Sequence, residues 1–90
     1  MSKKKEIIDL YNRYVESRNS AMERMDDENE KISRKADEQF VAAMFAMSAI
    51  DRVLDIIGAT LVVDEGNGGI AVDIENFEAE GQHHGEPISP

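Results

Sequence analysis

The first two thirds of the chain has the spacing of apolar residues that is typical of helices. No glycine or proline occurs between Met1 and Ile57, and apolar side chains recur there at alternating steps of three and four. The first series is Ile8, Tyr11, Val15, Met22, Met25 and Ile32, with Arg18 and Asn29 interrupting it. The same frame continues through Ala36, Gln39, Ala43, Ala46, Ile50, Val53 and Ile57. A frame kept this long predicts a helix-helix seam of the coiled-coil type.

Two arrangements fit this helical region. In one, helices over roughly residues 3–28 and 33–57 fold back as a hairpin at D-D-E-N-E-K, where Asp26 and Glu30 repel each other and Ser33 is a candidate N-cap. In the other, one long coiled-coil helix runs unbroken, supported by opposite charges at i,i+4 such as Asp27 and Lys31. Long unbroken helices are rare, so the hairpin is favoured.

The second helical segment contains a run that is apolar almost all round. The run F-V-A-A-M-F-A-M-S-A-I, from Phe40 to Ile50, is broken only by Ser48. It is too short to cross a membrane, and a helix that is apolar on every side needs burial on every side. One antiparallel neighbour covers one face, so the run predicts a homodimer or higher homo-oligomer. The predicted oligomer interface consists of Phe40, Met44, Phe45, Met47 and Ile50.

After Gly58, a predicted helix stop, the period of the pattern changes to two. The segments T-L-V-V-D-E-G and G-I-A-V-D-I-E pair as a β-hairpin about a turn at Asn67-Gly68. In this register Leu61, Val63, Ile70, Val72 and Ile74 lie on one face, and Thr60, Asp64, Ala71, Asp73 and Glu75 lie on the other. The fold class is therefore α+β and mainly helical: residues 1–76 form one domain, and residues 77–90 form a flexible acidic tail.

The segment from Asp64 to Glu75 has the outline of a calcium-binding loop. It opens with an acid, has a glycine at its sixth position and closes with Glu at its twelfth. Its third and fifth positions are Gly66 and Gly68, which supply no side-chain oxygen. We therefore interpret the segment as a turn between strands.

The tail holds the chain's two histidines. His83 and His84 stand beside Glu80 and Glu86, which are all possible ligands of a transition metal. Adjacent histidines in a polar, proline-punctuated segment are poorly preorganised for a metal. We expect neither a metal site nor a cofactor.

The sequence contains no recognisable catalytic motif. The chain has no cysteine, and no glycine-rich phosphate loop or nucleophile elbow appears, so we expect no enzymatic activity. The basic start at Lys3, Lys4 and Lys5 is followed by Glu6 and Asp9 without an apolar segment. We therefore expect no signal peptide and a cytoplasmic protein.

Charge divides the chain into two unequal parts. Residues 1–35 hold nine basic and eight acidic side chains, whereas residues 36–90 hold Arg52 as the one basic side chain against eleven acidic ones, within a net charge of −9. Such a surface disfavours direct binding to nucleic acid or to anionic membrane. It favours a protein partner that presents a basic surface.

Two functions are consistent with these features. The first is a small non-enzymatic interaction protein, an inhibitor or regulator that mimics nucleic acid and occupies a basic, nucleic-acid-binding surface of a larger protein. The predicted partner-binding acidic edge consists of Asp64, Asp73, Glu75, Glu78 and Glu80. The alternative is a structural oligomerisation module built on helix-helix packing, in which the acidic residues serve only solubility.

Overall fold

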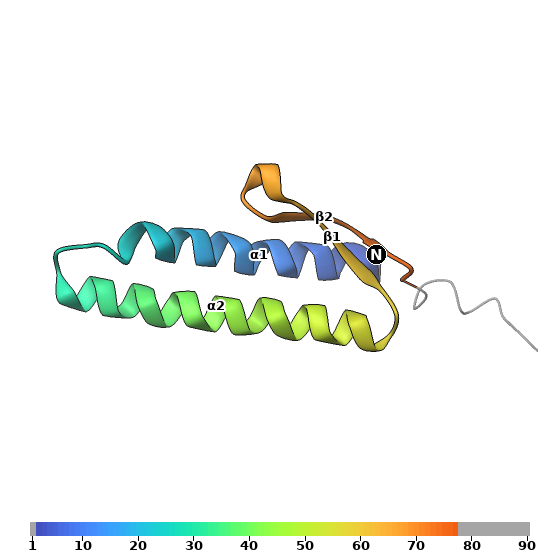
Figure 1. Cartoon of the computed structure of the whole chain (residues 1–90), viewed down its shortest axis with the longest axis horizontal. Helices are drawn as coiled ribbons and strands as arrows, with labels where there is room; N and C mark the ends of the chain where they lie inside the picture. Colours follow the sequence, from blue (N-terminus) through green and yellow to red (C-terminus); the bar gives the residue numbers. More distant parts are fainter. Residues whose placement is uncertain (1, 78–90) are drawn as a thin grey trace, which may run out of the picture.

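A computed structural model describes residues 2–77, and Figure 1 shows a helical hairpin with a β-hairpin packed along one side of it. The chain runs in the order α1 (Lys3–Arg24), α2 (Glu30–Ile56), β1 (Thr60–Asp64), a 3₁₀ turn η1 (Glu65–Asn67) and β2 (Ile70–Glu75). The helical hairpin is therefore confirmed, and the single long helix is not formed. Within the described residues, no helix is long and apolar enough to cross a membrane.

Both helices begin at capped residues. The Ser2 hydroxyl accepts a hydrogen bond from the backbone N–H of Lys5, and the Asn29 side chain accepts one from the N–H of Lys31. Ser33, the predicted cap, lies inside α2 instead and donates to the carbonyl of Met25 at 2.7 Å. The second helix thus begins three residues earlier than expected, because Asn29 caps it first.

The seam between the helices differs from the predicted frame in its second half. Ala36 and Ala43 are buried as expected, but Met47 and Leu54 are buried where Ala46 and Val53 had been expected. Val53 is 57% exposed. Positions spaced alternately by three and four residues average 3.5 per turn, so on a straight helix with 3.6 residues per turn they rotate gradually away from one face. In addition, the β-hairpin packs on the flank that carries Met47 and Leu54.

A polar group crosses this seam near the inter-helix turn. The Gln39 amide nitrogen donates to the carbonyl and hydroxyl oxygens of Ser17, at 2.9 and 3.0 Å. Its amide oxygen accepts from the Arg24 guanidinium at 2.7 Å. Around this group the buried side chains are the small Ala21, Ala36 and Ala43.

Helix α2 ends in a Schellman motif that directs the chain into β1. Gly58 has a φ of +82°, and its N–H donates to the carbonyl of Asp55. The N–H of Ala59 donates to the carbonyl of Leu54 at 2.8 Å, and both side chains are buried in one cluster with Ile74. The predicted helix stop at Gly58 is confirmed.

The two strands pair antiparallel with a bulge. Val62 pairs with Asp73 and Val63 pairs with Ala71, so Val72 is an extra residue in β2. The bulge turns Ala71 and Ile74 toward the helices, at 2% and 1% exposure, and leaves Val72 51% exposed. The predicted faces were therefore wrong for Ala71 and Val72.

The turn between the strands is also longer than expected. Asp64 pairs with Ile70, and the 3₁₀ turn η1 followed by Gly68 and Gly69 connects them. Both glycines have positive φ, +74° and +86°, which a residue with a Cβ rarely adopts. Asn67 does not share this conformation, so the loop is wider than a two-residue Asn-Gly turn.

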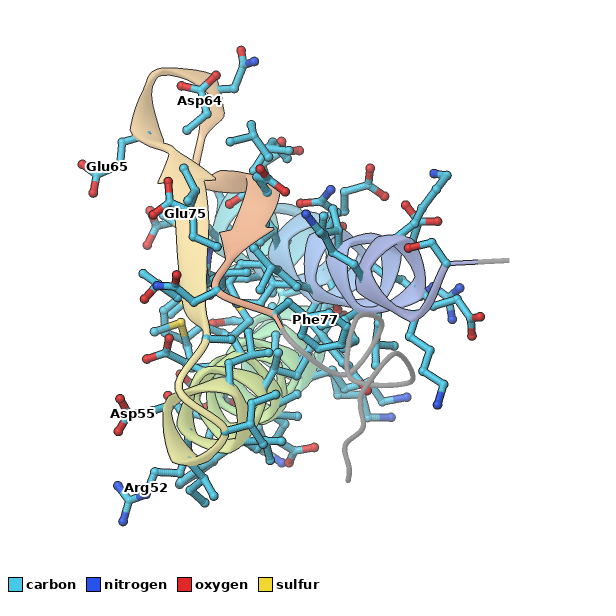
Figure 2. The ribbon with its side chains drawn as sticks, turned by 90° about the vertical axis from the view of Figure 1, so that its right-hand side faces the viewer. Arg52, Asp55, Asp64, Glu65, Glu75 and Phe77 are labelled. Atoms are coloured by element: carbon cyan, nitrogen blue, oxygen red, sulfur yellow. The ribbon has the colours of Figure 1, made fainter. Side chains whose placement is uncertain are left out.

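Specific side chains of α1 hold the β-hairpin in place. The Asn12 amide donates to the carbonyl of Ala71 at 3.2 Å and accepts from its N–H at 2.7 Å. Arg18 donates to the carbonyl of Gly68 at 2.8 Å, and Lys4 forms an ion pair with Asp73. The main core lies between these elements and consists of Tyr11, Val15, Met47 and Ala71. Phe77 packs against the neighbouring cluster at the end of the helices (Figure 2).

Candidate functional site: the outer surface of α2

Helix α2 carries large apolar side chains that the rest of the described chain leaves exposed. We call this exposed part of the helix the α2 outer surface. Phe45 is 72% exposed and Ile56 is 75% exposed. The apolar members of the surface are Val41, Met44, Phe45, Ala49, Val53 and Ile56, and its polar members are Glu38, Ser48 and Arg52.

The arrangement of the chain leaves this surface uncovered. The β-hairpin binds to α1 through Asn12 and Arg18, and Figure 1 shows α2 along the opposite edge of the molecule. In Figure 2 the Arg52 side chain points away from the helical pair. Phe45 and Arg52 are both exposed, so the surface is accessible at these positions.

The outer surface is hollowed beside Phe45. A hollow of about 190 Å³ is lined by Phe40, Val41, Met44, Phe45 and Ser48. Positions 41, 44, 45 and 48 have the spacing i, i+3, i+4, i+7. Four residues at this spacing form the hole that receives one side chain of a facing helix in a coiled coil.

A second apolar hollow lies between the helices. It measures about 220 Å³, and its lining consists of Ile7, Leu10, Ala49, Ile50, Val53 and Leu54. Leu10 is 38% exposed. The apolar surface of α2 thus continues across to α1 near the open end of the molecule.

The third hollow is polar and lies where α2 meets β1. It measures about 390 Å³ and is lined by Ser48, Asp51, Arg52, Asp55, Ala59, Thr60 and Leu61. Both carboxylates and the guanidinium are exposed. Nearby Tyr11 has a pKa raised above 10.0, chiefly because it is buried and also because of the negative charge of Asp51. A raised tyrosine pKa is what burial in a core produces, and it does not make the hydroxyl a base near neutral pH.

The structure separates the predicted oligomer interface into two groups. Phe45 and Met44 are exposed, and half-buried Phe40 lines the hollow beside them. Met47 is 7% exposed, and Ile50 packs against the core of the same chain. Val53 and Ile56 were missed. Their signal was position: they follow the apolar run within the same helix.

The predicted acidic edge lies partly within the described residues. Asp64 accepts hydrogen bonds from the N–H of Gly66 at 3.0 Å and from the Asn67 amide at 3.3 Å, so it stabilises its own turn. Glu75 is exposed on β2. Glu78 and Glu80, together with His83, His84 and Glu86, lie outside the described residues.

Asp73 is also engaged within the chain. Its carboxylate accepts from the N–H of Ile74 at 2.8 Å and forms an ion pair with Lys4 at 3.2 Å. The backbone hydrogen bond, followed by Lys4, holds the pKa of Asp73 below its ordinary value of 3.8. Both Asp64 and Asp73 therefore have structural partners. Within residues 2–77, no group of three or more candidate ligands converges as a metal site would require.

Comparisons with protein families, curated proteins and solved structures give no match to this chain.

Proposed function

We propose that the protein is a non-enzymatic assembly module that self-associates through the α2 outer surface. The observation that carries this proposal is the exposure of large apolar side chains on α2, above all Phe45 and Ile56. Exposed apolar side chains that are grouped on one element mark interaction sites more often than scattered ones do.

The amount of exposed apolar surface supports a stable contact. Val41, Met44, Phe45, Val53 and Ile56 are between 38% and 75% exposed. They offer roughly 500 Å² if each fully exposed large side chain counts as about 150–200 Å². A protein interface of standard size buries about 800 Å² per partner, of which about 60% is apolar, so the total exposed apolar area, spread over about half the circumference of α2, is of the order that one such interface buries.

The contact is driven by apolar burial and opposed by the net charge of the two copies. Each chain carries a net charge of −9, so two copies repel each other at low ionic strength. Added salt screens that repulsion. Self-association should therefore tighten as salt rises.

Sedimentation equilibrium tests the proposal. We expect the native chain to be a dimer or larger at tens of micromolar, and Phe45→Ser to weaken association at least about tenfold, as loss of a central aromatic anchor does. The matched control is Val72→Ser, which removes an apolar side chain of 51% exposure from β2 and should leave association unchanged. A native chain that stays monomeric at 100 µM, a concentration typical of such measurements, contradicts the proposal.

A second candidate function is the acidic interaction protein. The observation that favours it is the placement of Asp55, Asp64, Glu65 and Glu75 along one side of the molecule (Figure 2). Asp55, Glu65 and Glu75 form no ion pair within residues 2–77. A basic protein surface would complement them.

Salt separates the two candidates because it acts on them with opposite sign. A complex between the acidic side and a basic partner weakens steeply with ionic strength. We would measure binding to an immobilised basic nucleic-acid-binding protein at low and high salt, with the chain and with Glu65→Gln/Glu75→Gln. Salt-sensitive binding that the double variant loses supports the acidic function, and no binding at low salt contradicts it.

A further inference from the structure

The polar residues of the α2 outer surface are arranged symmetrically about Phe45. Glu38 lies seven residues before Phe45, and Arg52 lies seven residues after it. Seven residues are nearly two helical turns, so the three side chains lie on one stripe, with the charges about 10 Å to either side of Phe45. Glu38 and Arg52 are both exposed, and neither forms an ion pair within residues 2–77.

This arrangement is complementary to the same arrangement on a second copy when the two α2 helices lie antiparallel. With a two-fold axis at Phe45, Glu38 of one copy faces Arg52 of the partner subunit, and the same pair forms again on the other side of the axis. Val41 then faces Ala49 of the partner subunit. A parallel pairing would instead place Glu38 against Glu38 of the partner subunit and Arg52 against Arg52 of the partner subunit. Like charges facing each other oppose association, so the charges select the antiparallel orientation.

The hollow beside Phe45 is compatible with this register. Its four helix positions, 41, 44, 45 and 48, are centred between Met44 and Phe45. In an antiparallel pair with the axis at Phe45, the side chain that lies opposite the hollow is Phe45 of the partner subunit. Each copy would then insert one aromatic knob into the hole of the other.

We propose that two copies of the chain pack α2 against α2 antiparallel, with Phe45 at the two-fold axis and Glu38 of each copy opposite Arg52 of the other. This inference rests on the proposed function, because it names the partner and the register of the same surface. It identifies the occupant of the α2 outer surface as a second copy of this chain.

Charge reversal tests the register. Glu38→Arg alone and Arg52→Glu alone each place like charges opposite one another at both ends of the contact. We expect each to raise the dimer dissociation constant about tenfold, because like charges then face each other at two places in the contact. The double variant, Glu38→Arg/Arg52→Glu, restores opposite charges and should return the constant to within about twofold of the native value.

The matched control for net charge is Glu23→Arg, which changes an exposed residue of α1 by the same two charges as Glu38→Arg. It should leave the dimer intact or tighten it slightly, because it lowers the repulsion between copies. Single-variant losses without rescue in the double variant overturn the antiparallel register.

Cross-linking reads the orientation directly, and the chain has no cysteine of its own. Two variants, Val41→Cys and Ala49→Cys, are mixed and oxidised. The proposed register predicts that mixed disulfides between the two variants dominate, because position 41 faces position 49, whereas disulfides between identical variants would indicate a parallel or shifted pairing. A monomeric native chain overturns the proposed function as well, whereas a dimer with the wrong cross-links overturns the register alone.

Discussion

Helix α1 and helix α2 differ in how their apolar side chains are covered. Helix α1 is packed against α2 on one side and against the β-hairpin on another, and Asn12 and Arg18 hydrogen-bond to that hairpin. Its exposed large apolar side chains are Leu10 and Met22. Helix α2 carries the apolar run, yet it leaves Ile32, Val41, Met44, Phe45, Val53 and Ile56 exposed.

The more apolar helix is thus the less covered one. A chain that used its apolar residues only to stabilise one copy would place the β-hairpin over the richer helix. Here the fold of one copy uses only the face of α2 that carries Ala36, Ala43, Met47 and Leu54. The opposite face is left exposed, and each of the following changes tests that division.

The largest expected effect separates a buried position of α2 from an exposed one. Leu54 is 1% exposed, and Leu54→Ala should lower the free energy of unfolding by about 2–5 kcal/mol, because it leaves a cavity. Its neighbour Val53 is 57% exposed, and Val53→Ala should change the value by less than about 0.5 kcal/mol. Urea unfolding of both variants at a concentration where the chain is monomeric measures this. Equal losses would show that the outer face also stabilises the single copy.

The second largest expected effect concerns the hydrogen bonds that hold the β-hairpin on α1. Asn12→Ala leaves the N–H and carbonyl of Ala71 without their partner, and Ala71 is 2% exposed. We expect a loss of about 1–3 kcal/mol in the free energy of unfolding.

The control for Asn12→Ala is Arg13→Ala, at an exposed position one residue on. It should cost less than about 0.5 kcal/mol. If Asn12→Ala lowered the free energy of unfolding as little as this control, the β-hairpin would be held on α1 by apolar packing alone. The hydrogen bonds of Asn12 would then not contribute to the difference between the two helices.

The smallest effect lies at the Lys4–Asp73 pair between α1 and β2. Because folding lowers the pKa of Asp73 below 3.8, its contribution is present above that value and is lost as the pH falls through the lower pKa of the folded state. Asp73→Asn should therefore reduce the melting temperature slightly at neutral pH and should flatten its decline in acid. Melting curves from neutral pH down through the acid range measure this. Glu75→Gln removes an exposed carboxylate from the same strand and is the matched control for the change of charge.

The helices could be predicted because their signals are local. The lack of glycine and proline before Gly58, the acidic turn and the period of three to four all act within a few residues. The seam beyond Ala43 could not be predicted in the same way. Whether position 46 or 47 is buried depends on the flank of the helices to which the β-hairpin docks, and the hydrogen bonds that fix this join Asn12 to Ala71, 59 residues away.

The prediction of the strand faces was wrong for a related reason. A strict period of two assumes an unbroken ladder, and the bulge at Val72 shifts the face by one residue. For the candidate site, the all-round apolar run predicted that one antiparallel neighbour would cover only one face of the helix, and Met44 and Phe45 are exposed in the single copy. It carried no information on which members of the run the chain would bury itself, and Met47 and Ile50 were included for that reason.

The hydrogen-bonded group of Gln39, Ser17 and Arg24 concerns the uniqueness of the fold rather than its strength. The seam around it is lined by Ala21, Ala36 and Ala43, whose small side chains form a smooth surface. Two smooth helices can slide past each other by one turn at little cost in packing. Such a slip would separate the Gln39 amide from the Ser17 carbonyl and leave polar groups unpaired inside the seam. A single amide thus excludes alternative alignments that the alanines alone would allow.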